Sequence, residues 1–178
     1  MKEIGGFIAL ALRHNPSAAY ISLDENGWAN VDELIVGVQR AGRDLDRDML
    51  DKIVAADKKN RFAYNKDKTK IRANQGHSIA VDVGMEEKFP PDVLYHGTAE
   101  KYIESIRRSG IKKQKRNFVH LSLDEPTART VGARHGQPVV LKIDAKRMSE
   151  DGYKFFISAN GVWQTEFVPF SYVVQEIR

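Results

Sequence analysis

Residues 61–73 have the sequence Arg-Phe-Ala-Tyr-Asn-Lys-Asp-Lys-Thr-Lys-Ile-Arg-Ala, in which two short strand patterns flank a polar turn. Polar and apolar side chains alternate over residues 61–64, and a second strand pattern covers residues 69–73. The segment between them, residues 65–68, has the composition of a turn. This stretch predicts a β-hairpin.

Three helical patterns precede the hairpin. Apolar residues at helical spacing mark the first over residues 4–12, which Asn15-Pro16 ends. A second pattern runs from about residue 31 to residue 41, and a third begins near residue 46. Three helices followed by a hairpin are typical of a winged helix, a fold that commonly binds nucleic acid, although a fold alone does not establish a function.

The pattern changes at residues 84–92, Gly-Met-Glu-Glu-Lys-Phe-Pro-Pro-Asp. Paired prolines and charges cannot continue a helix or an inner strand, so this segment is predicted to be a linker. Beyond it, helices are expected near residues 102–106 and 124–135, and strands over residues 93–96, 118–122, 139–143, 155–158 and 172–177. We therefore predict an α+β protein with an N-terminal domain, residues 1–83, and a strand-rich C-terminal domain, residues 93–178.

Composition excludes several classes of site. The 178 residues are 42% hydrophobic, which suffices for a folded core, and they include no cysteine, so disulfides, thiolate metal sites and cysteine nucleophiles are excluded. The five histidines lack metal-ligand spacing, so no metal site is expected. The apolar N-terminal stretch carries Glu3 and is too short to span a membrane, which favours a cytoplasmic protein. Two small cores account for the apolar positions, which therefore do not define an oligomeric state; a monomer is the expectation.

The net charge of +4 is unevenly distributed. Residues 1–90 contain 14 Lys/Arg and 14 Asp/Glu. Residues 58–72 contain seven basic residues and only Asp67 against them, and residues 107–116 contain six basic residues and no acid. Local clusters of this kind favour a focused site for phosphate anions, although either cluster alone is equally compatible with a solvated lysine face.

Two polar motifs stand out in the first domain. Arg13-His14 combines a planar fork for phosphate oxygens with a group that exchanges a proton near neutral pH, although their position at a helix end, taken alone, favours a capping role. In residues 71–78, Ile-Arg-Ala-Asn-Gln-Gly-His-Ser, the run Asn-Gln-Gly-His-Ser (74–78) cannot form a core strand. Their side-chain donors and open backbone suit RNA or phosphate contact, the alternative being a polar loop that leaves the hairpin. The candidate RNA-binding residues are Arg72, Asn74, Gln75, His77 and Ser78.

These motifs belong to a longer ordered series: LRH (12–14), RF (61–62), IRANQGHS (71–78), LYHGT (94–98), RNFVHLS (116–122) and SANGVW (158–163). In this combination and order the sequence resembles the tRNA 2′-phosphotransferase family over nearly the whole chain. IRANQGHS is highly specific, whereas HGT is shared by many ADP-ribosyl transferases. The resemblance implies an N-terminal winged-helix RNA lobe and a C-terminal lobe of the ADP-ribosyltransferase type that binds NAD⁺.

The resemblance also implies site residues. It implies a catalytic tetrad that lies between the lobes: Arg13, His14, Arg61 and Arg116. It implies NAD⁺ contacts at His96, Gly97 and Thr98, and further ones at Gly110, His120 and Ser122. The sequence departs from the family at Phe118, where many relatives have histidine, and at Gln164, where leucine is common. The first departure argues against a paired His-x-His on that strand.

The activity implied by the resemblance has two steps and consumes NAD⁺ as a co-substrate. A 2′-phosphate of RNA, possibly tRNA, first displaces nicotinamide and leaves a 2′-phospho-ADP-ribosylated RNA. Attack by the ribose 2″-hydroxyl then gives an RNA 2′-hydroxyl and ADP-ribose 1″,2″-cyclic phosphate. Arginines that neutralise the phosphate would make a divalent metal unnecessary.

Two other classes of protein share parts of the pattern. A winged-helix regulator with a ligand-sensing domain would explain the helices and the basic hairpin but not the ordered polar motifs of the second half. A protein-directed mono-ADP-ribosyltransferase would need His-Gly-Thr but not residues 71–78. Only the phosphotransferase hypothesis predicts a cyclic phosphate product.

Overall fold

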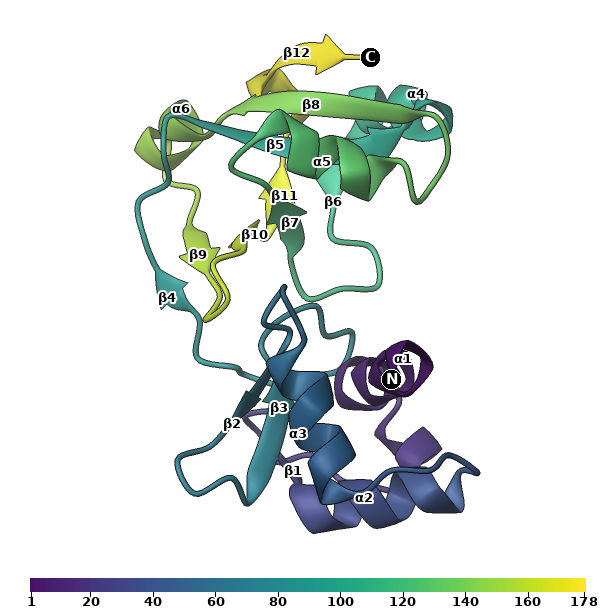
Figure 1. Ribbon diagram of the computed structural model, residues 1–178. Helices are drawn as coiled ribbons and strands as arrows, with labels where there is room; N and C mark the ends of the chain where they lie inside the picture. The colour runs from purple at the N-terminus through teal and green to yellow at the C-terminus, as the bar shows by residue number, and fades with distance from the viewer. The chain divides into compact units, whose positions relative to one another are not determined.

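The computed structural model describes residues 1–178, which form two compact units, unit 1 (Met1–Gly84) and unit 2 (Met85–Arg178). Each unit has a hydrophobic core of its own, drawn from residues 8–73 in unit 1 and from residues 94–168 in unit 2. Six α-helices and several antiparallel sheets make the chain a mixed α/β protein (Figure 1).

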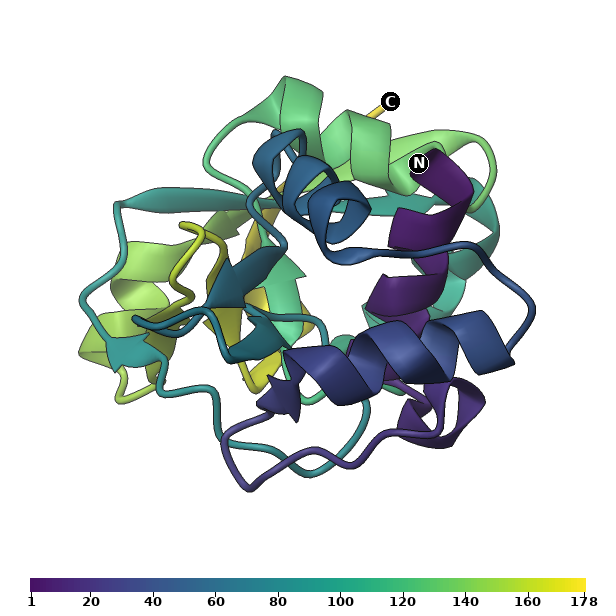
Figure 2. The same cartoon turned by 60° about the horizontal axis from the view of Figure 1, so that its bottom comes forward.

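Unit 1 contains three α-helices, a 3-10 helix and three short strands. In chain order these are α1 (Lys2–Arg13), η1 (Pro16–Ala19), β1 (Ala29–Asn30), α2 (Val31–Arg40), α3 (Arg47–Ala55), β2 (Phe62–Tyr64) and β3 (Lys70–Ala73). The three strands form one antiparallel sheet in the order β1-β3-β2. Figure 2 shows that α1, α2 and α3 run in different directions, and residues of all three helices contribute to the core of this unit.

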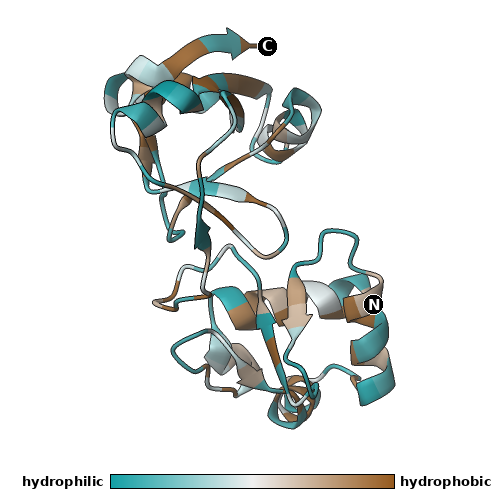
Figure 3. Cartoon of the chain, turned by 90° about the vertical axis from the view of Figure 1, so that its left-hand side faces the viewer, coloured by the Kyte–Doolittle hydropathy of each residue, from teal (hydrophilic) through white to brown (hydrophobic).

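The sequence explains where these helices begin. The side chain of Asn30 accepts a hydrogen bond from the Glu33 amide at 3.0 Å, and that of Asp46 accepts one from the Met49 amide at 2.7 Å. Both are N-terminal caps, which satisfy an amide that has no partner inside the helix. The apolar residues then recur on one side of each helix, so hydrophobic and hydrophilic segments alternate along the ribbons (Figure 3).

The three predicted helices and the predicted hairpin of unit 1 are confirmed as elements. Strand β1 was not predicted, because its two residues are too short to show an alternation. Ala29 and Asn30 pair with Ile71 and Lys70 of β3, which joins the start of α2 to the hairpin. The assignment of this unit to the winged-helix fold stays a prediction.

Unit 2 is richer in strands. Its elements are β4 (Glu86–Glu87), β5 (Val93–Ala99), α4 (Glu100–Ser109), β6 (Ile111–Lys112), β7 (Val119–Leu121), α5 (Glu125–Gly132), β8 (Pro138–Asp144), α6 (Ala145–Glu150), β9 (Phe155–Ile157), β10 (Trp163–Thr165), β11 (Phe167–Val168), η2 (Phe170–Tyr172) and β12 (Val173–Ile177). They form antiparallel sheets in the orders β12-β8-β5, β4-β9-β10-β7 and β11-β6.

The two larger sheets of unit 2 meet where β5 passes the end of β7. The amide of Tyr95 donates to the Ser122 carbonyl at 2.9 Å, and the Ser122 amide donates to the Tyr95 carbonyl at 2.7 Å. This bridge brings the polar residues of β5 and β7 to the same part of the unit. The assignment of unit 2 to the ADP-ribosyltransferase type stays a prediction.

The segment predicted as a linker, residues 84–92, is not wholly irregular. Glu86 and Glu87 form β4, which pairs with Ile157 and Phe156 of β9 at the edge of the sheet. An edge position tolerates charged residues, and the prolines follow only after this strand. The argument from prolines and charges therefore excluded an inner strand but not a short edge strand.

Candidate active site

Two sequence motifs of unit 1 lie side by side at the end of α1. The Nδ1 atom of His14, the C-terminal cap residue of this helix, lies 2.9 Å from the Ser78 hydroxyl. The Ser78 amide donates to the Arg13 carbonyl at 3.0 Å. These contacts fix the loop that follows β3 to the end of α1, although 64 residues separate the two side chains in sequence.

Gly76 lies beside the Arg13 side chain in this loop. Its φ of +87° belongs to the left-handed region that favours glycine, and a methyl group there would lie 3.5 Å from Cζ and Nε of Arg13. The distance is an ordinary contact, so the conformation of the backbone, and not a lack of space, favours glycine at this position.

His77 is a buried imidazole close to several cations. Its side chain is only 3% exposed, and its Nε2 atom has no hydrogen-bond partner. Burial, together with the charges of Arg13, His14 and Arg72, lowers the pKa of His77 from 6.5 to about 4. The imidazole is neutral near pH 7, so the positive charge around it comes from the arginines and not from His77.

Arg72 lies against an aromatic ring. Its guanidinium carbon is 4.5 Å from the centre of the Trp28 ring, and its Nη1 donates to the Asn26 carbonyl at 3.4 Å. Burial lowers the pKa of Arg72, whereas the charges of Asp24 and Asp82 raise it. The stacking fixes the plane of the side chain that the sequence predicts to bind RNA.

Arg61 is held by a carboxylate. Asp57 is 8% exposed and accepts hydrogen bonds from the Arg61 amide at 2.5 Å and from the Arg61 Nε at 3.0 Å. Burial raises the pKa of Asp57, but hydrogen bonds and charge from Arg61 outweigh it, so this pKa lies below the ordinary value of 3.8. The ionised carboxylate therefore fixes the direction of the guanidinium.

Asn74 links the end of β3 to Arg61. Its amide donates to the Arg61 carbonyl at 2.8 Å, and its side-chain Nδ2 donates to the Asn60 carbonyl at 2.7 Å. Asn74 is 6% exposed, and its Oδ1, like the buried Oε1 of Gln75, has no partner. Asn74 and His77 thus shape the loop from within, while Ser78 is exposed. Direct RNA contact by these residues stays a prediction.

In unit 2, two glycines let a helix touch a strand. A methyl group at Gly97 would lie 1.7 Å from the Ala128 carbonyl oxygen, and one at Gly132 would lie 2.4 Å from the Thr98 carbonyl oxygen. Strand β5 and helix α5 therefore make backbone contact at the His96-Gly97-Thr98 motif. Gly97 and Thr98 are buried, Thr98 with 6% of its surface exposed.

Hydrogen bonding defines the protonation of His96. Its Nδ1 lies 3.0 Å from the His120 carbonyl oxygen, which can only accept, so Nδ1 carries the proton. Burial lowers the pKa of His96, the charges of Arg116 and His135 lower it further, and the hydrogen bond raises it in part. The neutral ring therefore has Nε2 as an acceptor.

Arg116 is bound by the side chain of the same His120. Its Nη1 lies 2.8 Å from His120 Nδ1. Partial desolvation and the charge of Arg134 lower the pKa of Arg116, so a second arginine lies near the first. Strand β7 thus contacts two predicted site residues, Arg116 through a side chain and His96 through a carbonyl.

The sequence interpretation did not include Arg134 and His135, which follow α5. Their charges act on Arg116 and His96. The available signal was an Arg-His pair at a helix end, the same pair that ends α1.

For two further predicted residues, Gly110 and Ser122, the structure shows a role of the backbone. Gly110 ends α4 with φ +76°, and a methyl group there would lie 2.6 Å from Cζ of Phe167. Ser122 makes the bridge to Tyr95. At the first departure from the family, Phe118 packs on Phe156 with ring centres 5.5 Å apart. Whether Gly110 and Ser122 also contact NAD⁺ stays a prediction.

The second departure lies beside His120. Gln164 of β10 is directly opposite His120 of β7, so the two side chains emerge on the same face of the sheet. Gln164 is only 2% exposed, and its Nε2 has no partner.

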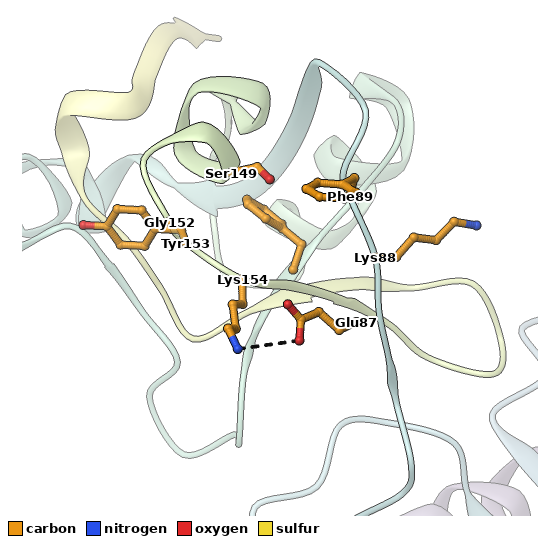
Figure 4. A pocket seen from close by; sticks show the side chains of 8 residues that line it. Glu87, Lys88, Phe89, Ser149, Gly152, Tyr153 and Lys154 are labelled. Carbon is orange, nitrogen blue, oxygen red and sulfur yellow. Dashed lines mark ion pairs between the residues drawn. The ribbon is translucent and has the colours of Figure 1, made fainter.

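A separate hollow lies at the β4 edge of unit 2 (Figure 4). It has a volume of about 520 Å³, and an ion pair of 3.7 Å between Lys154 and Glu87 borders it. None of the predicted site residues lines it, the lining being Glu87, Lys88, Phe89, Ser149, Gly152, Tyr153, Lys154 and Phe155. The hollow and the candidate site are therefore different places on this unit.

No three His, Asp or Glu side chains come close enough together to hold a metal ion. The helices are all too short or too polar to cross a membrane.

Comparisons with known proteins agree along the whole chain. Residues 1–167 match the profile of the family described as RNA 2′-phosphotransferase, Tpt1/KptA family. A protein of Fusobacterium nucleatum is 49% identical over 172 residues, which is 96% of either chain. A protein of Flavobacterium johnsoniae is 49% identical over 172 residues, which cover 97% of this chain and 94% of the relative. A protein of Escherichia coli is 47% identical over 169 residues, which cover 94% of this chain and 92% of the relative. Each is named "Probable RNA 2′-phosphotransferase".

Proposed function

The chain belongs to the RNA 2′-phosphotransferase, Tpt1/KptA family, and from this premise we propose that it removes an internal 2′-phosphate from RNA at the expense of NAD⁺. The observation that most supports the proposal is the composition of the two candidate clusters. Arg13 and His14 lie together in unit 1, and Arg116, His96 and His120 lie together in unit 2. Arginine with histidine suits a reaction that moves a phosphate.

We assign RNA binding to unit 1, as a winged-helix lobe. The loop that follows β3, residues 74–78, is fixed to α1 and to Arg61 by the hydrogen bonds of Ser78 and Asn74. Arg13 and Arg72 supply the positive charge near this loop, to which the neutral His77 adds none. These features support a bound 2′-phosphate near Arg13. The proposed RNA-binding residues are Arg72 of β3 and, in the loop that follows, Asn74, Gln75, His77 and Ser78.

We assign the co-substrate to unit 2, as a lobe of the ADP-ribosyltransferase type. His96 offers an unprotonated Nε2 that can accept a hydrogen bond, and the nearby Arg116 and Arg134 supply charge for phosphate groups. The donor set therefore fits NAD⁺, with Gly97 and Thr98 beside His96 in β5 and Gly110, His120 and Ser122 as further candidate contacts.

In the first step, a phosphate oxygen of the RNA forms a bond to C1″ of the nicotinamide ribose, and the bond from C1″ to nicotinamide breaks. The phosphate dianion is already nucleophilic, so this step requires orientation and no strong base. Arg13 and Arg61 would orient the phosphate, the latter through its fixed contact with Asp57.

In the second step, the ribose 2″-oxygen forms a bond to phosphorus, and the bond from phosphorus to the RNA 2′-oxygen breaks. The 2″-hydroxyl loses a proton and the RNA 2′-oxygen gains one. We assign this proton transfer to His14, either as the acid toward the leaving oxygen or as the base toward the attacking hydroxyl. Arg13, Arg61 and Arg116 would neutralise the charge on the other phosphate oxygens, which removes the need for a metal.

The test is an assay with NAD⁺ and an oligonucleotide that carries one internal 2′-phosphate. We expect an RNA 2′-hydroxyl, nicotinamide and ADP-ribose 1″,2″-cyclic phosphate, identified by mass spectrometry. The Arg116→Ala variant should accumulate the 2′-phospho-ADP-ribosylated RNA, because the second step carries the greater demand for charge neutralisation. Recovery of unreacted RNA from folded protein that binds NAD⁺ would exclude the proposed activity.

The same assay separates the other classes of protein. A mono-ADP-ribosyltransferase would release nicotinamide with a protein acceptor and form no cyclic phosphate. A nucleic-acid-binding regulator would bind the oligonucleotide and leave NAD⁺ intact. A cytoplasmic location, a monomeric state and tRNA as the RNA remain parts of the prediction that this assay does not address.

A further inference from the structure

The Nδ1 atom of His120 is a hydrogen-bond acceptor, as the chemistry of its partner Arg116 shows. The Nη1 of Arg116 lies 2.8 Å from His120 Nδ1. A guanidinium has donors and no acceptor, so the imidazole nitrogen accepts and carries no proton. His120 is therefore in its neutral form, with the proton on Nε2.

The main-chain carbonyl of His120 forms a hydrogen bond with His96, the other candidate residue of this cluster. This carbonyl accepts the Nδ1 proton of His96 at 3.0 Å. Residue 120 lies in the middle of β7, where pairing with Gln164 of β10 fixes its position. A residue held in a sheet is a rigid base for orienting a long side chain.

We propose that His120 is a positioning residue that holds the Arg116 guanidinium in the orientation needed for the reacting phosphate. This rests on the proposed function, because Arg116 is assigned there to the phosphate. The hydrogen bond uses one N–H of the guanidinium and leaves its other donors for an anion. Without it, the Arg116 side chain, which extends from an exposed loop, would sample several rotamers.

The inference differs from the NAD⁺ contact that the family resemblance implies for His120. A residue that only contacts NAD⁺ would be expected to affect NAD⁺ binding first. A residue that orients Arg116 affects the step in which phosphorus is attacked. The two roles are therefore separable by the step that slows.

Substitutions can place or remove an acceptor at the Nδ1 position. In His120→Asn the amide oxygen takes the place of Nδ1. In His120→Gln the amide lies one bond farther along, near the position of Nε2. His120→Leu removes the acceptor and introduces an apolar side chain of similar size.

Single-turnover assays with a 2′-phosphorylated oligonucleotide and saturating NAD⁺ would resolve the two steps. We expect His120→Leu and His120→Gln to slow the second step about 10- to 100-fold, the usual effect of removing a group that orients a site residue, with accumulation of the phospho-ADP-ribosylated RNA. His120→Asn should stay within about threefold of the wild type, because it restores the acceptor. If His120→Leu fails to fold, the comparison of Asn with Gln decides.

Equal slowing by Asn and Gln would overturn the inference, as would wild-type rates in all three variants. A change confined to the NAD⁺ concentration that gives half-maximal rate would do the same and would favour direct contact.

A measurement without RNA or NAD⁺ separates this inference from the proposed function. Long-range ¹H–¹⁵N NMR of the resting wild-type protein should show an unprotonated Nδ1 at His120 and a protonated Nδ1 at His96. A protonated His120 Nδ1 would contradict the hydrogen bond even if the enzyme were active. A protein with the expected tautomers and no phosphotransfer would contradict the proposed function and leave the hydrogen bond intact.

Discussion

At the scale of single residues, His77 couples the site of unit 1 to pH. The unfolded chain binds a proton at this imidazole near the ordinary pKa of 6.5, whereas the folded protein does so only near 4. Stability from the neutral, buried ring is therefore fully present above pH 6.5 and is lost as the pH falls toward 4. The loss approaches about 3 kcal/mol at the lower end.

We expect the free energy of unfolding of unit 1 to fall between pH 6.5 and pH 4.5. Urea denaturation followed through the amide NMR signals of this unit measures it. The variant His77→Gln does not titrate, so its stability should change much less over this interval. His135→Gln, which removes an exposed histidine of unit 2, serves as the control and should behave like the wild type. If the wild type and His77→Gln lost equal stability, the burial of a neutral His77 would be wrong.

The residues of the candidate site could be predicted in part. Motifs brought Arg13, His14 and His96 forward because their side-chain chemistry is visible in the sequence itself. The sequence could not show that His77 and Asn74 are buried, because burial depends on the packing of α1 against the loop after β3. The hydrogen bond between His120 and Arg116 could not be predicted either, because the segment before β7 contains several polar residues that could have been the partner of Arg116.

At the scale of elements, glycines in two helices of unit 1 have opposite roles. Gly37 in α2 packs against η1, where a methyl group would lie 1.7 Å from the Ala19 carbonyl oxygen. Gly6 in α1 has nothing within 4 Å of the same position. The first glycine allows two backbones to touch, and the second only weakens its helix.

The variants Gly37→Ala and Gly6→Ala should therefore change the free energy of unfolding of unit 1 in opposite directions. We expect a loss of about 3 kcal/mol for Gly37→Ala through overpacking. A gain of up to about 1 kcal/mol is expected for Gly6→Ala through helix propensity. Urea denaturation at pH 7 measures both, and stabilisation by both substitutions would contradict the close approach of α2 to η1.

Long elements were predicted better than short ones, for a physical reason. The helices of unit 1 contain several turns, so their apolar period and their caps, Asn30 and Asp46, are visible in the sequence. Strands β4, β6 and β11 have two residues each, and α6 has six, too few to establish a period. Their formation depends on partners from distant parts of the chain, such as β9 for β4.

At the scale of the whole molecule, two separate cores support a chain of two units. The buried cluster of unit 1 takes its members from residues 8–73, and that of unit 2 from residues 94–168. A core that needs no residue from elsewhere in the chain can form without the rest. The proposed tetrad is nonetheless divided, with Arg13, His14 and Arg61 in unit 1 and Arg116 in unit 2.

Residues 1–84, produced as a separate fragment, should therefore fold and yet be inactive. Unit 1 is large enough to bury a core of its own, including fully buried Leu12 and Leu34. We expect the amide NMR signals of its core to match those of the full chain, with no nicotinamide released in the 2′-phosphate assay. Leu34→Ala in the same fragment is the control, because it should cost about 2–5 kcal/mol and shift the urea midpoint. An unfolded fragment would show that this core depends on unit 2, and turnover by the fragment would show that Arg116 is dispensable.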